Sequence, residues 1–147
     1  MEKFKEIFGD RGTDSELLEN HRALLFSREK NIMAFPVTVM EIKNQDDVIK
    51  DSIPQYGEFS FQGAYIYEIG LQHGFKLKGR ITHLFSEDYL KSGRDWYRSE
   101  RNVERIIYIG DTFYTLSKGL VKASRMSDLK EINSLESPIE EQFSFRI

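Results

Sequence analysis

The stretch RIIYIGDTFYTLS, residues 105–117, decides the fold of this chain. Two short apolar runs flank Gly110-Asp111-Thr112, and a Gly-Asp pair between such runs is typical of a β-hairpin turn. Both runs carry apolar side chains on the two faces of the strand. Because strands that are buried on both faces read as continuous apolar runs, we expect a layer of protein against each side of this hairpin.

The hairpin opens a group of four segments whose apolar character falls along the chain. A strand at GLVKASRM (119–126) follows it, and then a short strand with one polar face at KEINSL (130–135). The same order occurs once before, with strands expected at 23–26, 32–39, 59–69 and 75–84 and a long polar connection between the second and third. The sequence therefore predicts an all-β chain of two four-stranded antiparallel meanders.

Three local features refine this prediction. Pro36 cannot donate a ladder hydrogen bond, so it marks a bulge or a position whose amide faces outward, and Gly63 is expected to kink the third strand. RGTDSELLENH (11–21) predicts a short N-terminal helix. Thr13 would cap this helix, Glu16 stands at capping-box spacing, and Leu17-Leu18 would face the core.

Composition limits the possible functions. The 147 residues fit one domain, and the formal charge of −3 gives no basic footprint for nucleic acid. No apolar run approaches the roughly 20 residues needed to span a bilayer, and the first residues lack the apolar core of a signal peptide. The chain has no cysteine, which excludes disulfides and thiolate metal sites. We expect no cofactor, no nucleic-acid partner and no membrane insertion.

Three stretches resemble blades of secreted bacterial and archaeal proteins with a C-terminal β-propeller domain, distantly similar to WD-repeat proteins. They are GDRGTDSELLENHRALLFSREKNIMAFPVTV (9–39), GAYIYEI…FKLKGRITH (63–83) and ERIIYIGDTFYTLSKGLVKASRMSDLKEINSL (104–135). The resemblance covers residues 7–135 and implies blade-like units at 22–85 and 103–136, with a tail at 137–147. It implies an extracellular or cell-surface location and brings no catalytic residues.

A closed propeller has typically four to eight blades, whereas residues 1–147 would hold about two, as the last part of such a domain. Two blades leave exposed apolar faces and open strand edges, which drive association. We therefore expect binding to protein partners and self-association into a homo-oligomer. The C-terminal segment QFSFRI (142–147) could be exchanged between copies.

Acidic residues near the N-terminus are the candidate metal ligands. Asp10, Asp14 and Glu16 place three carboxylates in a glycine-containing loop, and oxygen-rich loops can hold Ca²⁺. Their spacing is not that of an EF-hand, and helix capping accounts for these acids without a metal. The three histidines have no ligand spacing. We expect His73 to be solvated in a turn and His83 to be a hydrogen-bonded structural residue.

The candidate contact surface is DYLKSGRDWYRSER (88–101), in which Trp96 and Tyr97 alternate with Arg94 and Arg98. Aromatic and arginine side chains are the usual hot spots of interfaces. The neighbouring acids neutralise this stretch, which weighs against nucleic acid. In the alternative interpretation, the aromatic residues pack a connection between blades onto the core.

These observations predict a non-catalytic interaction or structural module of a surface propeller, with no catalytic residues, whose ligands bind through loops. Two alternatives stay open. One is part of a hydrolase-type enzyme that uses the carboxylates near Asp10 and Asp14, and the other is a calcium-stabilised adhesion module.

Overall fold

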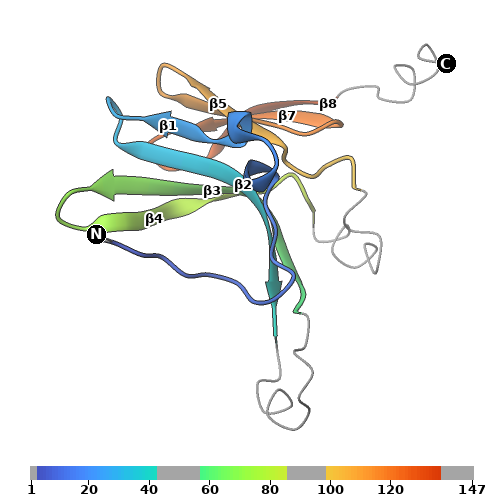
Figure 1. Ribbon diagram of the computed structural model, residues 1–147. Helices are drawn as coiled ribbons and strands as arrows, with labels where there is room; N and C mark the ends of the chain where they lie inside the picture. The colour runs from blue at the N-terminus through green and yellow to red at the C-terminus, as the bar shows by residue number, and fades with distance from the viewer. Residues whose placement is uncertain (1–2, 43–56, 86–98, 137–147) are drawn as a thin grey trace, which may run out of the picture.

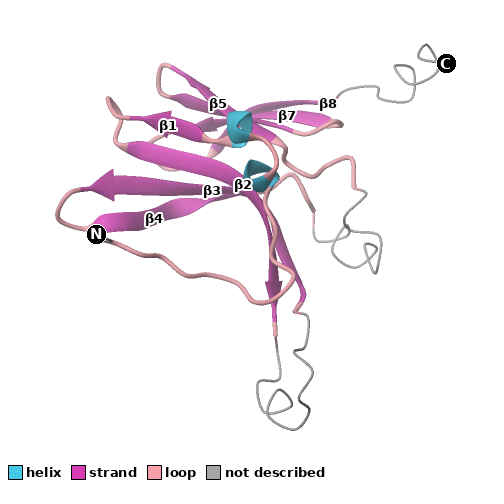
Figure 2. Cartoon of the chain, in the orientation of Figure 1, coloured by secondary structure: helices cyan, strands magenta, loops and turns pink. Residues whose placement is uncertain are grey.

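The computed structural model describes residues 3–42, 57–85 and 99–136, which form two four-stranded antiparallel sheets (Figures 1 and 2). The first sheet contains, in spatial order, β1 (Leu25–Ser27), β2 (Ile32–Glu41), β3 (Glu58–Gly70) and β4 (Gly74–Ile81). The second contains β5 (Arg105–Ile109), β6 (Thr112–Leu116), β7 (Leu120–Arg125) and β8 (Glu131–Glu136). Within each sheet every strand pairs with its neighbours along the chain, so both predicted meanders are confirmed.

The predicted hairpin is confirmed as β5 and β6. Ile109 pairs with Thr112 across the turn, and Gly110 has a φ of 58°, a left-handed conformation that glycine adopts without a Cβ clash. In Figure 1 the second sheet lies against the first. The core between them contains Ile66 of β3, Ile106 of β5 and Phe113 of β6, all buried.

Only one side of β5 is covered within the described residues, so the expectation that a layer lies against each side is wrong for the other. Ile106 faces the first sheet and is buried, whereas Ile107 and Ile109 are 40% and 68% exposed. Antiparallel pairing places on this open face Arg105, Ile107 and Ile109 of β5, Thr112, Tyr114 and Leu116 of β6, Val121, Ala123 and Arg125 of β7, and Asn133 and Leu135 of β8. We call these eleven residues the outer face.

Two three-residue 3₁₀ turns replace the predicted N-terminal helix. They are η1 (Glu16–Leu18) and η2 (His21–Ala23), and Leu18 is exposed to solvent instead of facing the core. The cap of η1 is Ser15, whose hydroxyl accepts a hydrogen bond from the Leu17 amide at 3.1 Å. Thr13 is not the cap, and its hydroxyl instead accepts from the Met40 amide at 3.0 Å.

The first predicted strand is shorter and less buried than its sequence indicates. Ala23 belongs to η2, and β1 begins at Leu25. Phe26 is 60% exposed because it lies on the side of the sheet away from β5 to β8, where the described residues cover it incompletely. The apolar run at 23–26 therefore does not form the buried strand that was expected.

The N-terminal segment, residues 3–15, completes the first sheet in two ways. Phe8 packs against Tyr65 and Phe35, with ring centroids 4.9 Å and 6.2 Å apart, and so covers an aromatic cluster on β2 and β3. Asp14 also pairs with Thr38 through two backbone hydrogen bonds, of 2.9 Å and 2.7 Å, beyond the end of β1.

Pro36 lies in β2 in regular register with Ala64 of β3. Because the amide of Thr38 points to Asp14, the nitrogen of Pro36, two residues earlier, faces the same edge, away from β3. This confirms the prediction that the backbone nitrogen of Pro36 faces outward from the strand ladder. At the same edge, the Pro36 carbonyl accepts a hydrogen bond from the Ser15 hydroxyl.

Buried polar contacts join the two sheets. The Gln62 side chain bonds the backbone of Val103 twice, at 2.8 Å and 3.1 Å. His83, which follows β4, lies with Nδ1 2.8 Å from Ser117 Oγ and Nε2 2.8 Å from Thr115 Oγ1. The structural role predicted for His83 is therefore confirmed, and the contacts tie the end of the first sheet to β6.

Gly63 is required by a close approach of two strands. It pairs regularly with Val37, and the register irregularity lies three residues earlier, at Ser60, instead of at the kink expected at Gly63. A Cβ built at Gly63 collides with the carbonyl oxygen of Ile81 and lies 2.7 Å from the Phe61 ring.

We expect Gly63→Ala to lower the free energy of unfolding by about 1–3 kcal/mol, because β3 and β4 must separate to admit the methyl group. Urea denaturation followed by circular dichroism measures this change. The matched control is Gly70→Ala, whose Cβ has no neighbour closer than 4.0 Å, the amide of His73. Equal midpoints for the two variants would contradict the required close approach.

Candidate functional site

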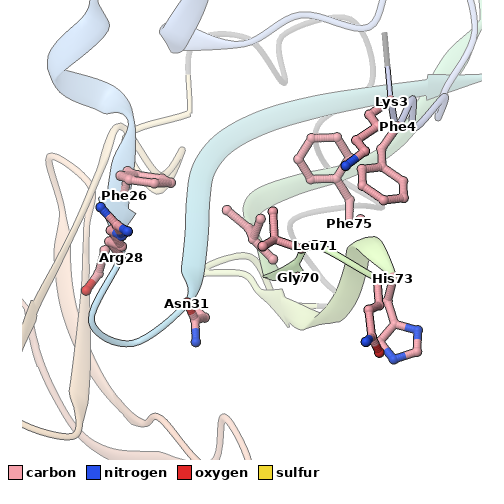
Figure 3. Close-up of a pocket in the computed structure, with 13 residues that line it drawn as sticks. Lys3, Phe4, Phe26, Arg28, Asn31, Gly70, Leu71, His73 and Phe75 are labelled. Carbon is pink, nitrogen blue, oxygen red and sulfur yellow. The ribbon is translucent and has the colours of Figure 1, made fainter.

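A cavity lies at one end of the first sheet, where two turns and the N-terminal segment meet (Figure 3). Its volume is about 860 Å³, within the usual range for small-molecule sites. We call it the loop cavity. Its lining residues are Lys3, Phe4, Phe26, Ser27, Arg28, Asn31, Ile69, Gly70, Leu71, Gln72, His73, Gly74 and Phe75.

Hydrogen bonds fix the turn between β1 and β2. The Ser27 hydroxyl accepts from the Lys30 amide at 3.2 Å, and Asn31 closes the turn with a φ of 55°. The carbonyl of Asn31 accepts from the Ile69 amide at 2.9 Å, which holds this turn beside the end of β3. The position of Arg28 at the cavity wall thus follows from a turn that is anchored at both ends.

The opposite wall is built on the turn between β3 and β4. Phe4 lies directly against Gly74, where an added Cβ would come within 2.5 Å of the phenyl ring. Phe75 packs edge-on against Tyr67, with ring centroids 6.3 Å apart. In Figure 3 Leu71 and Phe75 stand across the cavity from Phe26. Leu71 is 87% exposed, so this wall offers apolar surface that the described residues leave uncovered.

The ionisable side chains that line the loop cavity are two cations and one imidazole. Lys3, Arg28 and His73 come from the three different segments, and no aspartate or glutamate is among the lining residues. Within the described ranges neither Lys3 nor Arg28 forms an ion pair. His73 lies in an exposed turn, as the sequence predicted.

A second cavity, of about 220 Å³, contains two of the three predicted metal-ligand candidates. Asp14 and Glu16 line it together with Glu104, whereas Asp10 accepts a hydrogen bond from the Ile42 amide at 2.7 Å elsewhere. Asp14 is also occupied, because its carboxylate accepts from the Ser15 amide at 2.8 Å. In the part of the chain that the structure describes, no three His, Cys, Asp or Glu side chains form a group that could hold a metal ion.

Residues 88–98 of the predicted contact surface, including Arg94, Trp96, Tyr97 and Arg98, lie outside the described residues, as does the C-terminal segment 142–147. The loop cavity was not predicted. The signal available in the sequence is apolar residues beside or within polar turns: Leu71 in GLQHG and Phe26 just before SREKN. Only the fold shows that these two turns lie at the same end of one sheet.

Two stacked four-stranded meanders, each in chain order, form the arrangement of neighbouring propeller blades. A family model described as a beta propeller domain matches residues 1–129. The chain belongs to this β-propeller family. Its two sheets are about two blades of a propeller, and the loop cavity lies at the turn end of the first blade.

No curated protein and no solved structure matches this propeller domain. None of the helices in residues 3–42, 57–85 and 99–136 has the length and apolar character needed to cross a membrane. The family membership defines the architecture and names no ligand.

Proposed function

We propose that this propeller domain is a non-catalytic interaction module of an extracellular or cell-surface protein, and that it docks through the outer face of its second blade. The observation that carries this proposal is the alignment of Ile107, Ile109 and Leu135 on one open side of the sheet. The location rests on the resemblance of residues 7–135 to blades of secreted proteins.

The partner that fits the outer face is another β-sheet. The opposite face of the same sheet already packs on the first blade, through Ile106 and Phe113. In a propeller each blade face is covered by a neighbouring blade, and a repeat of this kind cannot bury both of its faces alone. We propose that a second copy of the chain supplies this sheet, which gives a homo-oligomer.

The edges of the sheets favour the same association. β5 and β8 are each paired on one side only among the described strands, so their outward backbone groups can bond another chain. Leu135 of β8 is 72% exposed at this edge. Apolar surface next to an unpaired edge is the combination that promotes pairing of sheets between molecules.

We expect the mass measured by light scattering to rise from one chain to two or more as the protein concentration increases. Ile109→Lys should move this transition to at least about tenfold higher concentration, because a lysine would have to be desolvated in the contact. The matched control is Leu18→Lys, an equally exposed position on η1. A wild-type mass of one chain over the whole range would refute the proposal.

A further inference from the structure

We propose that the loop cavity binds a small organic anion with an apolar body, of the class of arylalkyl carboxylates. This inference goes beyond the docking function, because the cavity belongs to the first blade and the outer face to the second. It rests on the shape, the apolar walls and the charge of a site built from three separate segments of the chain.

The apolar walls define the body of the ligand. Phe26 stands on one side, and Leu71, Phe75 and Phe4 stand on the other (Figure 3). Phe26 and Leu71 are largely exposed although both are apolar. A flat aromatic or branched aliphatic group between them would remove this surface from water, which is the main source of affinity in such sites.

The charges define the head group. The cations Lys3 and Arg28 come from different segments of the cavity lining, and His73 adds an imidazole ring. No carboxylate among the lining residues neutralises them. An arginine presents two parallel N–H donors that match a carboxylate, so Arg28 is the residue assigned to the head group. A ligand with an ammonium group would meet only like charge here.

The size and the rigidity of the site favour a small molecule over a protein segment. A volume of about 860 Å³ accommodates a compact ligand. A backbone bond from Ile69 to Asn31 holds the first turn, and strand pairing of Gly70 with Gly74 closes the second. Phe4 packs against Gly74, so the walls exist before the ligand binds. A preformed site loses little ordering entropy on binding.

The test uses the Ile109→Lys protein, which separates ligand binding from self-association. Amide shifts in ¹⁵N–¹H spectra are followed at pH 7 during titration with 1-naphthaleneacetate, with its neutral analogue 2-(1-naphthyl)ethanol and with acetate. We expect saturable shifts at residues 26–31 and 69–75 for 1-naphthaleneacetate. The neutral analogue should bind about tenfold more weakly, and acetate more weakly still, because they lack the charge and the body respectively.

Matched variants assign the two parts of the site. Arg28→Gln should weaken 1-naphthaleneacetate about tenfold and leave the neutral analogue unchanged, whereas Leu71→Ser should weaken both. Arg22→Gln is the control, because Arg22 is exposed on η2 and does not line the cavity. Since Arg28 and Leu71 are both exposed, neither variant threatens the fold.

Three results would overturn the proposal. The first is equal affinity for 1-naphthaleneacetate and its neutral analogue. The second is an equal effect of Arg28→Gln and Arg22→Gln. The third is saturation of residues 26–31 and 69–75 by an acidic peptide with one phenylalanine when 1-naphthaleneacetate leaves them unchanged, which would make the occupant a protein segment. None of these depends on whether the wild-type protein self-associates.

Discussion

Phe113→Ala is expected to lower the free energy of unfolding by about 3–5 kcal/mol, the largest effect of any single substitution considered for this domain. Phe113 is 0% exposed and lies in the core between the two blades, in one cluster with Ile66 of the first blade and Ile106 of the second. Alanine would leave a cavity that neither sheet can close alone, because backbone hydrogen bonds hold each one rigid. The lost dispersion contacts add to the lost hydrophobic transfer energy.

Chemical denaturation in urea measures this loss, with near-ultraviolet and far-ultraviolet circular dichroism as two probes of one transition. The matched control is Phe26→Ala, which removes the same atoms from a largely exposed position and should cost less than about 1 kcal/mol. A small loss at Phe113, comparable with that at Phe26, would show that the two blades do not share one core.

Stability should also fall by about 2 kcal/mol between pH 7 and pH 5 through His83 alone. Burial, reinforced by the positive charges of Lys122 and Arg101, lowers the pKa of the His83 ring to about 4 from its ordinary value of 6.5. Below pH 6.5 the His83 ring therefore binds a proton in the unfolded chain but stays neutral in the folded chain until the pH approaches 4. The contribution of the neutral ring is complete above pH 6.5 and is lost as the pH falls toward 4.

The His83 effect is isolated by comparing urea denaturation of the wild type and of His83→Gln at pH 7 and pH 5. Between pH 7 and pH 5, the free energy of unfolding should fall by about 2 kcal/mol less in His83→Gln than in the wild type. All other titrating groups are common to both proteins. If His83→Gln does not fold, the ring protons of His83 in the wild-type NMR spectrum give the same pKa directly. A titration midpoint near 6.5 would contradict the mechanism.

Local sequence signals were sufficient to predict the meanders. The Gly110-Asp111 pair located the turn of the second blade because a left-handed residue between two apolar runs has few alternatives to a hairpin. Pro36 was placed correctly because the missing amide proton is a property of the residue itself. These features depend on neighbours along the chain, and the structure preserves them.

Features that depend on distant contacts were predicted less well. Thr13 and Ser15 are both good caps by residue type, and the choice between them is made by β2. The Met40 amide engages Thr13, while the Pro36 carbonyl accepts from Ser15. The covered and open sides of β5 could not be assigned either, because Ile106 and Ile107 are identical residues whose exposure is decided by the first blade.

The candidate site shows the same limit more strongly. Its walls come from residues 3–4, 26–31 and 69–75, and no spacing rule brings these segments together. The sequence instead indicated Asp10, Asp14 and Glu16 as candidate ligands, because they lie within seven residues of one another. The fold separates Asp10 from the other two and supplies each aspartate with a backbone partner. Proximity in sequence was therefore a poor guide to the position of the candidate site.

The brevity of β1 determines where this protein can be divided. With three residues β1 pairs with only the start of β2. Further along the same edge of β2, Met40 and Thr38 form backbone hydrogen bonds with Asp10 and Asp14. A fragment that begins at residue 22 would retain all eight strands. It would lose the backbone hydrogen bonds of Asp10 and Asp14 to the edge of β2. The natural unit of folding thus begins before its first strand, and truncation or fusion at that point would expose backbone where the intact chain is closed.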